Sequence, residues 1–451
     1  MRRFPLLPAL ALAFTAALPA LAASPNFILI LTDDQGWPMM NERMHPDLPE
    51  SRTAGVITPA MDRLVREGMR FTSGYSPGPL CTPTRRSIQN GMTPARQRGT
   101  EFVSKWVPAD HLTIPHALRQ VNPAYACAHL GKWGEDMIST PEQCGYDVSD
   151  GMTGNNTGGS GAERFTDIVK EDPKLISSLT RRAIDFIGAQ AAARRPFFLQ
   201  LSHYAQHRQV QASPATNAKW LAGPKPTRQF TPTFGAMLED LNAGLTRLLD
   251  ELDRLGLAGT TYVIFTADNG GYATYADTDK SLPSNNHPLR AQKQHLYEGG
   301  IRVPFIVRGP GVKPGSAVHE PVVGYDLLPT LYDLADGKAA LPADIDGGSF
   351  RPLLDNAGAG HVKRALPGIV HHRPNYAPLP VSTLRVGDLK LMVNCKTGAR
   401  ELYNLATDIG ETKNLAAAMP EKATEMAGVL RTYLKSVNAE THDPTPAPTK
   451  K

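Results

Sequence analysis

Acidic and amide side chains follow two apolar runs of the chain. Asp33 and Asp34 come directly after one run, and Asp268 and Asn269 come directly after another. Their oxygens are hard ligands, which suit Ca²⁺ or Mg²⁺ better than a metal that prefers thiolate or imidazole. Either pair alone is also typical of ordinary turn chemistry after a strand. Two such pairs within one sheet favour a metal site.

A second group of reactive side chains lies in the segment CTPTR, residues 81–85. A lone cysteine in a loop is usually a small buried hydrophobic residue. Here a proline and an arginine stand at fixed offsets from Cys81, and the residues that follow can begin a helix. Because the N-terminal end of a helix dipole favours an anion, the segment predicts an anion site beside Cys81 and Arg85.

The elements that must position these residues alternate between strands and helices. Near-continuous apolar runs are typical of strands buried on both faces, and helical stretches fall between them. Thr58 and Pro59 open one such helix, with Thr58 as its cap, and it extends through Met69. The alternation predicts an α/β fold: a large domain with a mostly parallel central sheet flanked by helices. The predicted strands are residues 26–32, 125–130, 196–202 and 261–267, and the longest predicted helices are 174–193 and 231–255.

The predicted sheet gathers several polar residues at one edge. Ligands of such sheets bind beyond the carboxyl ends of the strands, and Asp33, Lys132, His207 and Asp268 all follow predicted strands.

The pattern changes after about residue 367. Short apolar runs at 382–386, 389–394 and 400–404 are separated by turn residues, and a helical stretch follows near 421–437. This part predicts a small C-terminal antiparallel sheet with a terminal helix. The expected division is 23–366 for a catalytic α/β domain, 367–440 for the small α+β subdomain and 441–451 for a disordered Pro/Thr-rich tail.

Taken together, these segments resemble the type I sulfatase family, the formylglycine-dependent, arylsulfatase-like enzymes of the alkaline phosphatase superfamily. In that family a Cys-x-Pro-Ser/Thr-Arg motif directs oxidation of the cysteine to formylglycine, an aldehyde that hydrates and attacks sulfate esters. The resemblance implies that Cys81 becomes formylglycine, with a formylglycine-generating maturation enzyme as a partner. It covers most of residues 25–437, through NFILILTDDQG, TPAMDRLVREGMRFTSGYS, CTPTRRSIQNG, GKW at 131–133, VIFTADNGG, NNHPLRAQKQHLYEGGIRVP and ELYNLATDIGETKNL.

The resemblance also implies a set of metal ligands. Asp33, Asp34, Asp268 and Asn269 would bind Ca²⁺, with Mg²⁺ as the alternative. The modified Cys81 would complete this set, because the metal holds both the nucleophile and a sulfate oxygen.

Four further residues receive catalytic roles from the same resemblance. Arg85 would stabilise the hydrated nucleophile, and Lys132 and Lys293 would neutralise the charge of the sulfate in the transition state. His207 would protonate the leaving alcohol oxygen. Strand alternation could place either His207 or His203, four residues earlier, toward the site. The family pattern selects His207 and leaves His203 as a candidate for the substrate wall.

One position departs from the family pattern. The family usually has a histidine two residues after the lysine of the Gly-Lys-Trp segment, and here that position is Gly134. That histidine is thought to take a proton when sulfate is expelled from the nucleophile. His129, Glu135 and Asp136 are candidates to replace it, and strand alternation does not choose among them. We expect one of them to substitute, because the rest of the constellation is intact.

The N-terminus carries two arginines within residues 1–3, and residues 4–22 contain no charge. The uncharged stretch is just long enough for an uncleaved membrane anchor. Three prolines and an Ala-x-Ala ending instead favour a cleaved secretory signal over residues 1–22. We therefore expect a periplasmic or secreted protein without stable membrane insertion.

A secreted protein can form disulfides, and this chain has four cysteines. If one has a chemical task, at most one bridge and one free thiol follow from the other three. The pair Cys127–Cys144 closes the shortest loop and is the expected bridge.

Composition narrows the function classes. The chain has 451 residues with a formal net charge of +5. The charge is spread along the chain, and no basic run resembles a nucleic-acid footprint, so no nucleic-acid partner is expected. Mild positive charge suits an anionic substrate.

With the resemblance, this charge balance leads to a secreted sulfatase that hydrolyses sulfate monoesters, with a sulfated carbohydrate as substrate and aryl sulfates as surrogates. The alternatives are a phosphate or phosphonate ester hydrolase of the same superfamily, or a weakly catalytic protein that binds sulfated glycans, which the glycine at 134 would suit.

Overall fold

The computed structural model describes residues 24–102, 111–135, 137, 139–158, 171–272, 278–366 and 368–443. The expected signal peptide, Asp136 and residues 444–451 of the expected tail lie outside these ranges. None of the helices within them is both long and apolar enough to cross a membrane.

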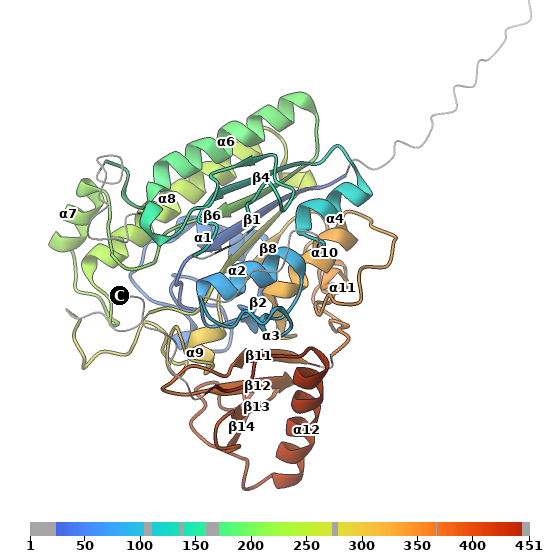
Figure 1. Cartoon of the computed structure of the whole chain (residues 1–451). Helices are drawn as coiled ribbons and strands as arrows, with labels where there is room; N and C mark the ends of the chain where they lie inside the picture. The colour runs from blue at the N-terminus through green and yellow to red at the C-terminus, as the bar shows by residue number, and fades with distance from the viewer. Residues whose placement is uncertain are drawn as a thin grey trace, which may run out of the picture.

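An eight-stranded sheet forms the centre of the protein, with the strand order β5-β4-β6-β1-β7-β8-β2-β9 (Figure 1). Strand β8 runs antiparallel to both of its neighbours, and the other pairs are parallel. The expected mostly parallel sheet is therefore confirmed. Its strands are β1 (Asn26–Thr32), β2 (Met69–Phe71), β4 (Ala126–Gly131), β5 (Val148–Ser149), β6 (Phe197–Ser202), β7 (Thr261–Ala267), β8 (Phe305–Arg308) and β9 (Ser316–Val318); β3 (Gly74–Tyr75) pairs separately with β10 (Val322–Val323).

Helices cover both faces of this sheet, and the alternation of β1 shows why. Ile28 and Ile30 pack in one apolar layer with helices α1, α6 and α8, whereas Phe27, Leu29 and Leu31 pack in the other with α2, α4 and α10. The interior of a strand covered on both faces is apolar on both sides, as residues 27–31 of β1 are. The helices are α1 (Pro59–Glu67), α2 (Cys81–Asn90), α3 (Pro94–Gln97), α4 (Ile114–Val121), α6 (Ile176–Ala193), α7 (Pro214–Ala222), α8 (Pro232–Arg254), α9 (Glu298–Ile301), α10 (Leu327–Leu334) and α11 (Arg351–Asp355).

A four-stranded antiparallel sheet follows, at the bottom of Figure 1, with helix α12 (Pro420–Ser436) packed against it. This confirms the expected small sheet and terminal helix. Its strands are β11 (Ile369–Arg373), β12 (Val381–Val386), β13 (Leu389–Asn394) and β14 (Arg400–Asn404), in that order. An apolar cluster that includes Tyr75, Tyr297, Ile369 and Met392 joins the four-stranded sheet to β3 and to the segment that leads into α9. The division at 366/367 stays a prediction.

Two local expectations need correction. The helix that begins at Pro59 ends at Glu67, because Met69 already belongs to β2. The Thr58 hydroxyl does not cap a backbone amide; it donates to the carboxylate of Asp62 at 2.9 Å.

The expected Cys127–Cys144 disulfide is also wrong, because both are free thiols in the structure. Both side chains are buried in the same apolar layer, where each serves as a small hydrophobic residue. Burial raises the pKa of each thiol to about 12, so neither is readily oxidised through its thiolate.

Candidate active site

The acidic ends of β1 and β7 lie side by side. The two strands are parallel, and Thr32 pairs with Ala267 at their last position. The backbone N–H of Asp34 donates to Asp268 Oδ1 at 3.1 Å, and Asn269 Nδ2 donates to Asp34 Oδ1 at 2.8 Å. The structure thus brings together the residues that the sequence indicated as hard ligands.

Two cationic side chains, Lys132 and Arg85, contact these carboxylates from neighbouring elements. Lys132, which directly follows β4, places Nζ 2.5 Å from Asp33 Oδ2 and also donates to Asn155 Oδ1. Arg85 on α2 donates through Nε and Nη2 to Asp268 Oδ2, at 3.0 and 2.7 Å, and through Nη1 to the Lys132 carbonyl at 2.6 Å. Arg85 therefore fixes the start of α2 against the ends of β4 and β7.

Cys81 is the first residue of α2 and shares a helix face with Arg85, four residues later. Its side chain is fully buried among the same charged groups. Burial raises the pKa of the thiol and outweighs the opposite effect of Lys132 and Lys293. Since the thiolate is the nucleophilic form of cysteine, unmodified Cys81 is a poor nucleophile here.

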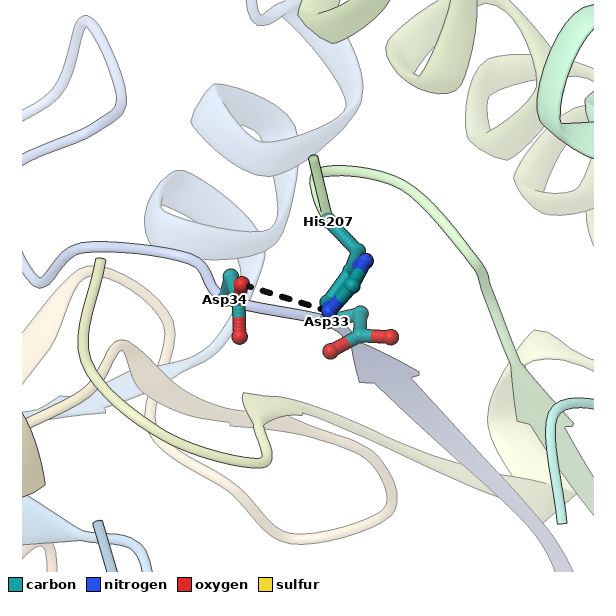
Figure 2. Close-up of side chains that lie close together, drawn as sticks. All are labelled: Asp33, Asp34 and His207. Atoms are coloured by element: carbon teal, nitrogen blue, oxygen red, sulfur yellow. Dashed lines mark ion pairs between the residues drawn. The ribbon is translucent and has the colours of Figure 1, made fainter. Parts of the chain in front are cut away.

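Lys293 and His207 complete the group from two loops. Lys293 Nζ lies 2.6 Å from Asp34 Oδ1, and His207 Nε2 lies 3.9 Å from Asp34 Oδ2 (Figure 2). His207 Nδ1 donates to the carbonyl of Arg208, which leaves Nε2 directed at the acidic pair. Burial lowers the pKa of His207 to about 4, against the pull of Asp34 and Asp33.

These groups border a cavity of about 370 Å³. Three of the predicted metal-binding and catalytic residues, Asp34, His207 and Lys293, reach its wall. Cys81, Lys132 and Asp33 are fully buried. His203 is fully buried as well, so the expectation that it forms the substrate wall is wrong. The lining residues are Asp34, Phe102, Glu135, Asn155, His207, Arg208, Tyr272, Lys293 and Gln294.

The cavity also distinguishes two of the candidates for the missing histidine, His129 and Glu135. His129 is fully buried and packs edge-on against Trp133 at 4.8 Å, and burial lowers its pKa to about 3. Asp136 lies outside the described residues. Glu135 lines the cavity: its N–H donates to Thr82 Oγ1 at 3.0 Å, and its carboxylate accepts from the backbone N–H of Asn155. Of the two candidates that the structure describes, Glu135 lines the cavity and His129 does not.

A histidine at position 134 would be strained. Its φ is +151°, and an added Cβ would lie 3.1 Å from Met137 Cγ. The local backbone is thus built for glycine, and the neighbouring carboxylate occupies the cavity instead.

The acidic pairs fit a hard divalent cation. Asp33 Oδ1 and Asn269 Oδ1 are buried and accept no hydrogen bond in the part of the chain that the structure describes. Ligand atoms of Asp33, Asp34 and His207 lie within 4.8 Å of one another. Burial and the charge of Asp33 raise the pKa of Asp268 to about 7, a repulsion that a bound cation would relieve. The oxygen-rich donors match Ca²⁺ or Mg²⁺.

Comparison with known proteins agrees with this geometry. Residues 25–337 match the family model described as Sulfatase, and residues 290–440 match the model described as N-sulphoglucosamine sulphohydrolase, C-terminal. The chain therefore belongs to the sulfatase family. Within it, the protein is a type I sulfatase, a sulfuric ester hydrolase.

Individual relatives share much of the chain. N-acetylgalactosamine-6-sulfatase of Mus musculus is 29% identical over 383 residues, which cover 75% of this chain and 68% of the relative. Arylsulfatase A of Bos taurus is 30% identical over 387 residues, which cover 77% and 71%. The solved structure of Ps i-CgsB in complex with k-i-k-neocarrahexaose has a TM-score of 0.74 at 25% identity and covers 93% of this chain and 95% of its own.

Several cavity residues could not be found from the sequence. Arg208 and Gln294 lie in loops, and Asn155 begins a short 3-10 helix (Asn155–Gly158); no periodicity in the sequence marks them as cavity residues. Only the folded chain shows that Asn155 contacts both Lys132 and Glu135.

Proposed function

We propose that this protein is a secreted, formylglycine-dependent sulfatase that uses a divalent metal and acts on a sulfated carbohydrate. The observation that carries the proposal is the convergence of the Cys81 helix, four hard ligands and three cations beside one cavity. The carbohydrate substrate is supported by the relative named for an amino-sugar sulfate and by the neighbour solved with a neocarrahexaose. Residues 1–22 would be removed on export.

The proposal requires two groups, a formylglycine and a metal ion, and named residues would hold each of them. Formylglycine at position 81 would supply the nucleophilic oxygen, and a cation held by Asp33, Asp34, Asp268 and Asn269 would supply Lewis-acid charge.

The chain's own residues do the remaining work. Lys293 at the cavity wall and Lys132 beneath it place fixed positive charge where a bound sulfate ester gains negative charge. Arg85 donates to Asp268 and so keeps α2 in place against the end of β7. His207 would act in its imidazolium form, in which Nδ1 donates to the Arg208 carbonyl and Nε2 carries the proton that passes to the leaving oxygen.

The test of this function is multiple-turnover release of inorganic sulfate from a sulfated oligosaccharide, compared with a phosphate ester of the same alcohol. Preferred sulfate release supports the proposal. Preferred phosphate release would contradict it, as would saturable binding of the sulfated sugar without sulfate release.

We expect His207→Gln to act according to the leaving group. A sugar alcohol needs a proton as it departs, so kcat for a sugar sulfate should fall by about 10²–10⁴-fold. A nitrophenolate leaves without protonation, so nitrophenyl sulfate should lose far less. Steady-state kinetics with both substrates on one enzyme preparation provides its own control. Equal losses on both would contradict the role as proton donor.

We expect Glu135→Gln to lower kcat by about 10²–10⁴-fold with a smaller change in KM, if Glu135 is the proton acceptor that replaces the family histidine. The amide keeps the size of the side chain and loses its basicity. Stopped-flow measurement should then show a burst of alcohol before a slow steady rate, whereas the wild type stays linear. Glu142→Gln, an exposed change outside the cavity, is the matched control. An unchanged kcat in Glu135→Gln would contradict the assignment.

A further inference from the structure

A second polar cavity, of about 500 Å³, lies between the two sheets. We call it the junction cavity. The loop after β1, the end of β2, the segments after α9 and β9, and the β12–β13 turn all contribute to it. It shares none of its lining residues with the cavity of the active site. None of the roles proposed above for the catalytic residues involves the junction cavity.

Two buried guanidinium groups line the junction cavity. Arg302 is 2% exposed and Arg385 is 6% exposed. Arg302 has a carboxylate partner, since its Nε lies 2.6 Å from Glu298 Oε2. Arg385 donates only to the Gly387 carbonyl and the Tyr75 hydroxyl, and it has no carboxylate within ion-pair distance among the described residues.

The buried charges around Arg385 do not balance. Lys390 lies 2.9 Å from Glu298 and 2.7 Å from Glu411, so this cluster holds three cations and two carboxylates. A buried charge without a counter-ion is costly, and the surplus here is positive. An anion in the junction cavity would supply the missing charge.

Two imidazoles also line the junction cavity. The rings of His45 and His319 are 5.0 Å apart, and the Nδ1 atoms contact the N–H of Asp47 and the hydroxyl of Thr72, at 3.2 and 3.0 Å. Both Nε2 atoms are left without a hydrogen-bond partner in the described ranges. Guanidinium and imidazole N–H groups are suited to the oxygens of a tetrahedral oxyanion.

The acidic residues of the junction cavity do not cancel its preference for an anion. Asp47 and Asp388 are both exposed, so water and salt screen them, whereas the two arginines are buried. A divalent metal is not favoured either, because the described residues gather three metal-ligating groups only at Asp33, Asp34 and His207.

The junction cavity opens at the same edge of the large sheet as the active site. Thr72 and Ser73 follow β2, which runs in the direction of β1, and β2 lies three strand positions from β1 in the sheet. Three spacings between strands amount to about 14 Å. An extended sugar chain is long enough to reach both places.

We propose that the junction cavity is an oxyanion-binding site for a sulfate group, held by Arg385 and Arg302 with His45 and His319. The proposal rests on the proposed function only for the source of the anion. That source is either a second sulfate group of the substrate chain or free inorganic sulfate.

The test measures binding rather than turnover, so it stays separate from the proposed function. Inorganic selenate serves as the probe: it should give an anomalous peak in the junction cavity of crystals of the full chain, and calorimetry with sulfate should show a site that His319→Ala weakens about tenfold. His319 is exposed, so this variant should fold; Arg385→Gln should remove the site altogether. His361→Ala, at another exposed histidine outside the junction cavity, is the matched control.

Kinetics then separates the two sources. If His319→Ala raises KM for a multiply sulfated oligosaccharide and leaves nitrophenyl sulfate unchanged, the anion belongs to the substrate chain. If selenate binds and neither KM changes, free sulfate occupies the site. Absence of selenate from the junction cavity, with sulfate binding unaltered in both variants, would overturn the proposal.

Discussion

Replacement of Cys81 by alanine should lower sulfate-ester hydrolysis by roughly 10⁴-fold or more, because it removes a nucleophile that acts as a unit with its neighbours. Alanine fits the buried first turn of α2, so circular dichroism and melting temperature should change little. Cys127→Ala is the matched control, since Cys127 is equally buried but lies in β4, away from the cavity. That variant should keep its activity.

Mass spectrometry of the peptide that holds position 81 connects this loss to the proposed modification. The active wild-type enzyme should carry formylglycine there, and preparations with more unmodified thiol should be proportionally less active. Near wild-type activity in Cys81→Ala, or full activity with an unmodified thiol, would contradict the proposal.

Removal of divalent metal should abolish activity and lower the melting temperature together. Asp33, Asp34 and Asp268 are buried side by side. Asp33 Oδ1 and Asn269 Oδ1 accept no hydrogen bond among the described residues, and a bound cation would give both a partner. A ligand present at a hundred times its Kd stabilises the folded state by about 2.7 kcal/mol, so chelation should produce a clear shift in a thermal melt.

Readdition of Ca²⁺ or Mg²⁺ should restore both properties, and the more effective ion identifies the native metal. Asp33→Asn should make the melting temperature insensitive to chelator. Asp185→Asn, an exposed change on α6, should keep the wild-type response. Full activity after exhaustive chelation, with no metal detected by elemental analysis, would exclude the metal site.

The sequence predicted the bounds of several strands well because a change from apolar to polar residues marks where they end. Strands β1, β7, β13 and β14 have the expected bounds, and β1 and β7 end where a continuous apolar run meets two polar residues. Strand β11 escaped notice because it reads IVHHR, and the polarity of His371 and His372 hides a fully buried strand.

The choice between His203 and His207 shows a limit of periodicity. Strand β6 ends at Ser202, so alternation no longer applies to either histidine, and family resemblance alone selected His207. Similarly, Glu135 could not be preferred over His129 until the course of the loop after Trp133 was known. The positive surplus of the junction cavity was equally hidden, because Glu298 and Arg302 are far from Arg385 and Lys390 in the sequence.

The burial of Cys81 determines whether the proposed oxidation comes before or after folding. All ten residues of α2 are buried, and the Cys-Thr-Pro-Thr-Arg segment is wound into the first turns of that helix. A maturation enzyme that reads this segment cannot reach it in the finished fold, so the proposed oxidation must occur on the nascent or still unfolded chain. Folding and the proposed modification would therefore compete, and a molecule that folds first would be lost to catalysis for as long as it stays folded.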